Sequence, residues 1–144
     1  MMQAALVVDA NILIRAVLGT RVRGLIQAHA VSTRFFAPDT AFDEARRHLP
    51  ALMKKRGVDP AAALSVLTAL EGLVQVLEPE VYGSVRQEAL KRIGGRDVDD
   101  WPVLACAMVL GSPVWTEDAD FFGTGVATWT SDRIELFLSP REGT

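Results

Sequence analysis

The stretch AALVVDANILIRAVLG, residues 4–19, changes its pattern at a single acid, Asp9. Residues 4–8 form a short apolar run, β-branched toward its end, which is typical of a buried strand. From residue 11 onward the apolar residues recur at the helical period, and the segment ends at a glycine. In α/β folds, ligands bind beyond the carboxyl ends of the strands. We therefore interpret Asp9 as part of a ligand site.

The rest of the chain repeats this alternation. Strands are expected at residues 4–8, 34–38, 73–79, 112–116 and 126–130. Helices are expected at residues 11–19, from residue 20, and at 40–57, 61–72, 80–95 and 101–111, with a closing segment at 131–139. Asp39 is placed to cap the third helix, Pro50 should kink or split it, and Asp59 with Pro60 should start the fourth. Strands separated by helices predict an α/β/α sandwich with a central parallel sheet of about five strands.

Bulk properties restrict the class of protein. A chain of 144 residues that is 49% hydrophobic can bury one core, so we expect one domain over residues 1–140 and a short tail at 141–144. The net charge of -3 argues against a general nucleic-acid coat protein but permits a local basic surface. The single cysteine, Cys106, cannot form a disulfide within the chain. With no signal peptide and no long apolar run, this predicts a cytoplasmic protein with no membrane partner.

Carboxylates from four separate segments are predicted to meet at one edge of the sheet. They follow the first strand, lie on the third helix, open the apolar helix and follow the fourth strand: Asp9, Glu44, Asp100 and Asp118. Carboxylates packed together raise one another's pKa unless a cation compensates. Oxygen ligands select Mg²⁺ or Mn²⁺, and no cluster of Cys and His offers a zinc site.

Four motifs resemble those of one family. VVDANIL, FDEARRHL, DVDDWPVLACAMVLG and VWTEDADFFGTG are similar, in this order, to the acidic motifs of PIN-domain nucleases. The likeness is to the VapC-like toxin ribonucleases of bacterial type II toxin–antitoxin pairs, and it covers essentially the whole chain. It implies a Mg²⁺- or Mn²⁺-dependent endoribonuclease that leaves 5′-phosphate and 3′-hydroxyl ends. It also implies a homodimer and a cognate antitoxin as partners.

Transferred residue by residue, the resemblance implies that Asp9, Glu44, Asp100 and Asp118 are catalytic. Asp9, Asp100 and Asp118 would hold the metal. Asn11 and Thr116 match polar positions that hold water or the metal shell, although Asn11 is equally suited to cap the first helix and Thr116 to fill a strand position.

Several alternatives stay open. The family commonly has small or aliphatic residues where this chain has Trp101 and Pro102, so Asp97, Asp99 and Asp100 all compete for one place. Asp118 competes with Glu117 and Asp120 in an acidic turn.

Basic residues are candidates for phosphate contacts. Arg15 and Arg96 lie close to two acidic motifs, and a further group lies on the third helix: Arg46, Arg47, Lys54, Lys55 and Arg56. Charge runs on helices are usually solvated. His29 and His48 have no partner at catalytic spacing and are interpreted as surface residues.

Two other functions compete with the ribonuclease. A metal-dependent phosphatase or phosphotransfer domain also places acids at strand ends. One such class needs a nucleophilic Asp and a second Asp two residues later, and DAN at residues 9–11 has asparagine at that second position. A catalytically silent RNA-binding module of the same fold is the other.

The early helices also bear on self-association. They carry more apolar residues than one sheet face needs, which favours a two-fold homodimer; these residues are Ile14, Leu18, Leu25 and Ile26.

Overall fold

Strands and helices alternate along residues 3–139, the part of the chain that this computed structural model describes. The tail expected at residues 141–144 lies outside it. The strands are β1 (Ala4–Val8), β2 (Thr33–Pro38), β3 (Val74–Leu77), β4 (Val114–Trp115) and β5 (Thr128–Trp129). The helices are α1 (Ala10–Leu18), α2 (Thr20–His29), α3 (Asp39–Lys55), α4 (Pro60–Leu70), α5 (Pro79–Tyr82), α6 (Arg86–Ile93), α7 (Trp101–Leu110) and α8 (Ile134–Leu138). Single 3₁₀ turns are η1 (Gly83–Val85), η2 (Val98–Asp100) and η3 (Ala119–Phe121).

All five strands pair in parallel in the order β3-β2-β1-β4-β5. The chain starts at the central strand, builds outward through β2 and β3, and then returns to the other side of β1 with β4. Val8 of β1 pairs with Trp115 of β4. The direction of winding therefore changes between β1 and β4, and such a change leaves a crevice beyond the carboxyl ends of the two strands.

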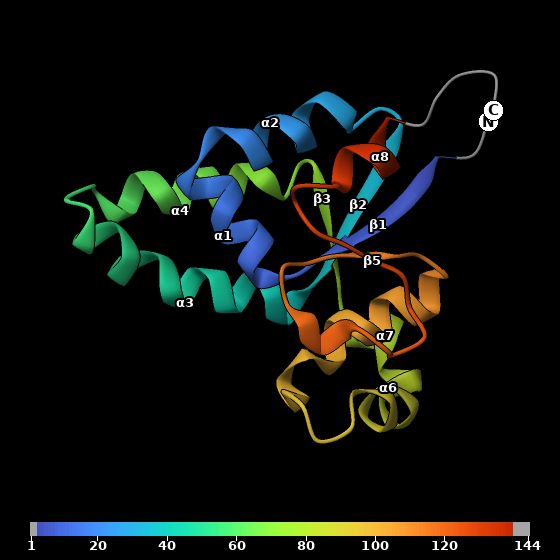
Figure 1. Cartoon of the computed structure of the whole chain (residues 1–144). Coiled ribbons are helices and arrows are strands. Elements are labelled where there is room, and N and C mark those ends of the chain that lie inside the picture. Colours follow the sequence, from blue (N-terminus) through green and yellow to red (C-terminus); the bar gives the residue numbers. More distant parts are fainter. Residues whose placement is uncertain (1–2, 140–144) are drawn as a thin grey trace.

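Helices cover both faces of the sheet, as Figure 1 shows. Because successive side chains of a strand point to opposite faces, Leu6 and Val8 join the core under α1, α2, α3, α4 and α8. Val7 and Phe36 join a second core under α5, α6 and α7. The predicted sandwich with a five-stranded parallel sheet is confirmed.

Two predicted helix ends are confirmed in detail. The Asp59 carboxylate accepts a hydrogen bond from the backbone N–H of Ala61 at 3.0 Å, and Pro60 is the first residue of α4. Farther along the chain, α7 stops at Gly111, whose φ of 62° lies in the left-handed region that favours glycine.

The structure corrects two predictions about α3, one of them only in part. Asp39 is the first residue of the helix and not its cap, and its carboxylate accepts instead from the hydroxyl of Tyr82. Pro50 was predicted to kink or split the helix, and it does not split it, because α3 runs unbroken from Asp39 to Lys55; the kink stays a prediction. Leu49 and Met53 are buried on either side of the proline, so packing holds the helix together despite one missing hydrogen bond.

The single helix predicted at residues 80–95 was also wrong, because the segment divides into α5, η1 and α6. Gly83 follows the end of α5, and glycine has a lower helix propensity than any other residue except proline. Tyr82 is 1% exposed, so its burial fixes the end of α5 before the chain turns. The strands at 112–116 and 126–130 exist but are shorter than predicted, with two residues each.

The early helices use much of their apolar surface internally. Ile26 is completely buried and has no surface to offer a second subunit, which corrects its place in the expected dimer contact. Ile14, Leu18 and Leu25 pack against the core but stay partly exposed.

Candidate functional site

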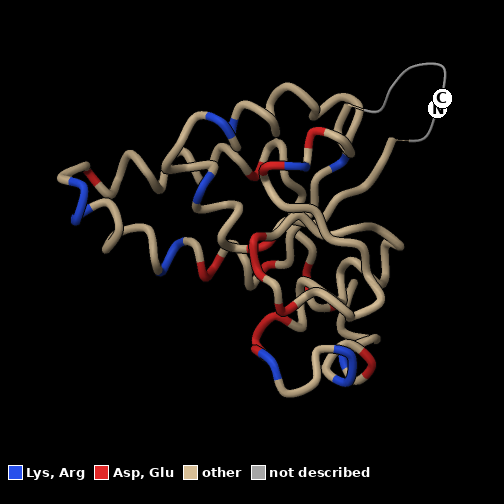
Figure 2. The backbone as a smooth tube through the Cα atoms, viewed as in Figure 1, with Lys and Arg blue, Asp and Glu red and all other residues tan. Residues whose placement is uncertain are grey.

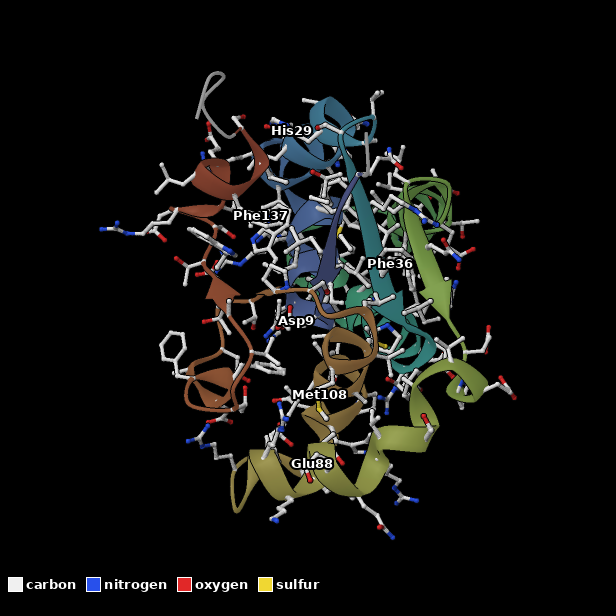
Figure 3. The ribbon with its side chains drawn as sticks, turned by 90° about the vertical axis from the view of Figure 1, so that its right-hand side faces the viewer. Asp9, His29, Phe36, Glu88, Met108 and Phe137 are labelled. Carbon is white, nitrogen blue, oxygen red and sulfur yellow. The ribbon has the colours of Figure 1, made fainter. Side chains whose placement is uncertain are left out.

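Asp9 lies directly after β1, at the crevice between β1 and β4 (Figure 3). Its side chain has two partners. One oxygen accepts from the backbone N–H of Ile12 at 3.0 Å and caps α1, and the other accepts from the hydroxyl of Thr116 just beyond β4. Of the two roles left open for Asn11, the capping of α1 is excluded, because Asp9 caps the helix and also connects the two strand ends.

Burial dominates the electrostatics of Asp9, which is 6% exposed. Burial raises the pKa of Asp9 to about 6, the hydrogen bonds from Thr116 and Ile12 oppose this, and the charges of Asp118 and Glu44 add to it. A group with such a pKa is largely ionised at neutral pH but at a cost, which a nearby cation would remove.

A second group of acids gathers beside it. One carboxylate oxygen each from Asp100, Asp118 and Asp120 lies within 4.8 Å of the other two. Asp118 follows β4, and its backbone N–H donates to the Thr116 hydroxyl at 2.9 Å. The N–H of Asp120 in turn donates to the Asp118 carboxylate at 2.9 Å. These bonds hold the acidic turn against the end of the sheet.

Asp100 combines a buried carboxylate oxygen with a strongly raised pKa. One of its oxygens is buried and has no hydrogen-bond partner within the described part of the chain. Burial, followed by the charges of Asp97 and Asp118, raises the pKa of Asp100 to about 8. A buried carboxylate oxygen without a donor is unusual, because such groups are normally paired. The orphaned oxygen and the all-carboxylate donor set fit a hard divalent cation.

A cavity of about 390 Å³ lies beside this cluster, and Asp100 and Asp118 of the cluster line it. All four acids of the sequence prediction line it, namely Asp9, Glu44, Asp100 and Asp118. Glu44 reaches the cavity from α3. Asn11 lines the cavity as well, whereas Thr116 acts through its bonds to Asp9 and Asp118. Figure 2 shows acidic residues concentrated at this end of the sheet.

The structure distinguishes among the competing acids before α7. Asp97 is exposed and uses its carboxylate to accept from the N–H of Asp99 at 3.1 Å. Asp99 lines the cavity but is exposed, and only Asp100 presents a buried, unpartnered oxygen. Trp101 does not displace Asp100, because its ring packs edge-on against Tyr82 with centroids 5.5 Å apart.

The acidic turn after β4 is sorted in the same way. Glu117 points away from the cluster, since its carboxylate accepts from the N–H of Ser131 at 2.6 Å. Asp120 joins the cluster, although sequence reasoning placed it only as a competitor of Asp118. The signal that indicates it is the D-x-D spacing, which in a tight turn brings alternate side chains together.

The basic candidates have different surroundings. Arg96 donates to the backbone carbonyl oxygens of Asp120 and Phe122, and these hydrogen bonds hold the acidic turn. Arg15 lines a different cavity, with Arg21 and Arg56. Arg47 is the one Lys or Arg among the described residues that line the acidic cavity. His48 is exposed, in agreement with its surface interpretation.

The order of the strands and the acid-lined cavity have a counterpart in known proteins. A family model described as PIN domain matches residues 7–139. The chain belongs to the PIN domain family. A comparison with curated protein sequences gives no match.

Solved structures share the fold of this PIN domain. PAE2754 from Pyrobaculum aerophilum is 21% identical with a TM-score of 0.72, over 96% of this chain and 91% of that one. VapBC2 from Rickettsia felis, bound to a promoter DNA fragment, is 12% identical with a TM-score of 0.63, over 88% and 98%. VapBC-1 from nontypeable Haemophilus influenzae is 17% identical with a TM-score of 0.58, over 90% and 99%. At these identities the comparison establishes the fold.

Within residues 3–139, none of the helices of this PIN domain combines the length and the apolar character that crossing a bilayer requires.

Proposed function

We propose that this protein is a Mg²⁺- or Mn²⁺-dependent endoribonuclease of the cytoplasm, and the toxin of a type II toxin–antitoxin pair. The observation that carries the proposal is the convergence of Asp9, Glu44, Asp100 and Asp118 on one cavity. The buried oxygen of Asp100, for which the described residues supply no donor, adds to it. Membership of the PIN domain family supports a nuclease.

Each acid has a distinct part in the proposal. Asp9, Asp100 and Asp118 hold the cation, and Glu44 completes its shell or orients the attacking water from the α3 side. When bound, a divalent cation supplies the positive charge that stabilises a phosphodiester under attack. Thr116 keeps Asp9 and Asp118 in place through its hydroxyl, and Asn11 is positioned to contact substrate or water at the cavity wall.

The proposed partners are RNA, an antitoxin protein and a second copy of the chain. The similarity of fold to VapBC2 and VapBC-1 supports an antitoxin partner. For the homodimer, Ile14, Leu18 and Leu25 remain partly exposed on α1 and α2 and are candidates for the contact. Sedimentation at micromolar concentration tests this, and a species that stays monomeric would contradict it.

The test of activity compares the wild type with Asp9→Asn on single-stranded RNA, with Mn²⁺ and with EDTA. Asp9→Asn keeps the shape of the side chain and removes its charge, so we expect cleavage to fall by at least about two orders of magnitude. Asp43→Asn is the matched control, because Asp43 is an exposed acid on α3. End-group analysis should find 5′-phosphate and 3′-hydroxyl ends.

Two results would contradict the proposal. Equal cleavage by the wild type and Asp9→Asn, or full cleavage in EDTA, would assign the activity to another site or to a contaminant. Hydrolysis of a generic phosphatase substrate without RNA cleavage would favour a phosphatase. RNA binding without cleavage by the wild type would favour a silent RNA-binding module.

A further inference from the structure

Helix α3 turns one continuous stripe toward the acid-lined cavity. Thr40, Ala41, Glu44 and Arg47 all line it, and their spacing of three and four residues places them on one face of the helix. Arg47 is one turn beyond Glu44, about 4.5 Å farther along the helix axis. The helix that brings Glu44 to the cavity therefore also brings a guanidinium to its edge.

Arg47 stands out within the described lining by its charge. Five carboxylates line the cavity, contributed by Asp9, Glu44, Asp99, Asp100 and Asp118. Arg47 is the one Lys or Arg among the lining residues that the structure describes. Each phosphodiester of a nucleic acid carries a negative charge, so a strand entering this cavity meets repulsion from every charged side chain except one.

Its neighbour Arg46 shows what a structural arginine looks like on the same helix. Arg46 forms ion pairs with Glu71 and with Asp43, the latter at 3.6 Å, and its guanidinium lies 5.8 Å from the ring centroid of Phe42. Arg47 is exposed, and residues 3–139 supply it with neither an ion pair nor a side-chain hydrogen bond. Its five N–H donors are thus available to a ligand.

We propose that Arg47 binds a phosphate group of the RNA strand at the edge of the cavity, next to the phosphodiester that is cleaved. This inference rests on the proposed function and names a residue that selects and places its polyanionic substrate. A guanidinium matches two phosphate oxygens at once, which a lysine ammonium does not. Because Arg47 is cationic, it binds the substrate and takes no part in holding a metal.

The surroundings of α3 agree with this path for the strand. Beyond Arg47 the helix carries Lys54 and Lys55, both exposed, and Figure 2 shows basic residues along α3 as far as the turn into α4. The net charge of the chain is -3, so attraction of a polyanion depends on a local group of cations of this kind.

The binding experiment uses Arg47→Ala, with Arg46→Ala as the matched control and Arg47→Lys as the conservative variant. The affinity of a fluorescent single-stranded RNA is measured by anisotropy in EDTA, where no cleavage is expected, at a series of salt concentrations. Loss of one phosphate contact should reduce the slope of log affinity against log salt by about 0.7. We expect this change in Arg47→Ala, an unchanged slope in Arg46→Ala, and a retained slope with weaker binding in Arg47→Lys.

The activity experiment uses the same variants with Mn²⁺. We expect Arg47→Ala to raise KM for RNA by about tenfold with a much smaller change in kcat, the pattern of a lost substrate contact. Mn²⁺ affinity measured by calorimetry should equal that of the wild type.

Two results would overturn the role of Arg47. One is a salt slope and KM in Arg47→Ala that match those of Arg46→Ala, and the other is a loss of Mn²⁺ affinity in Arg47→Ala. A wild type that binds RNA but does not cleave it would refute the proposed function instead, and the salt slopes would still decide whether Arg47 contacts phosphate.

Discussion

Asp9→Asn should make the metal-free protein more stable at alkaline pH while it abolishes most activity. Burial is the main reason that the pKa of Asp9 is raised from 3.8 to about 6. The folded protein therefore holds this proton more tightly than the unfolded chain. The stability linked to the proton is complete below pH 3.8 and is lost as the pH rises through 6.

The magnitude follows from the difference between the two pKa values. At about 1.4 kcal/mol per unit, the ionised carboxylate costs the folded state about 3 kcal/mol above pH 6. The asparagine does not carry this cost, but its amide nitrogen cannot accept from the Thr116 hydroxyl, which costs about 1 kcal/mol. We expect Asp9→Asn to be more stable than the wild type by about 2 kcal/mol at pH 8 in EDTA, and not to be more stable at pH 4.

Urea unfolding followed by circular dichroism measures this difference at both pH values. Asp43→Asn, a change at an exposed acid, should alter stability by less than about 0.5 kcal/mol at either pH. Addition of Mn²⁺ at pH 8 should stabilise the wild type more than Asp9→Asn, because only the former keeps all its carboxylates. An Asp9→Asn protein that is less stable than the wild type at pH 8, or a difference that does not change with pH, would refute the reasoning.

Three further changes test the rest of the site. Thr116→Val removes the hydroxyl that connects the ends of β1 and β4 and should cost about 1–2 kcal/mol in urea unfolding; an unchanged midpoint would contradict this. Arg96→Ala removes the donor that holds the acidic turn, so amide hydrogen exchange should quicken at residues 119–125 with little change elsewhere, and uniform exchange would argue against it. Asp120→Asn should weaken Mn²⁺ binding by about tenfold in calorimetry, whereas Glu117→Gln should not; equal affinities would remove Asp120 from the site.

Local chemistry was enough to predict much of the fold. The apolar run at residues 4–8, the Asp59–Pro60 start of α4 and the glycine end of α7 each depend on backbone preferences that a few neighbouring residues determine. Asp9 and Asp118 were predicted to meet because parallel strands end at one edge of a sheet, a rule that needs only the order of the strands. Glu44 lies on α3, and its place in the site was predicted mostly from the resemblance to PIN-domain nucleases.

Tertiary packing decided which side chains face the cavity. Asp100 was separated from Asp97 only when the start of α7 was buried against the sheet and left one oxygen without a partner. Arg46 and Arg47 are adjacent in sequence, but one meets Glu71 on another segment and the other meets the cavity. Such orientations depend on partners far along the chain, and burial then sets the pKa values, so a local pattern of residues does not contain them.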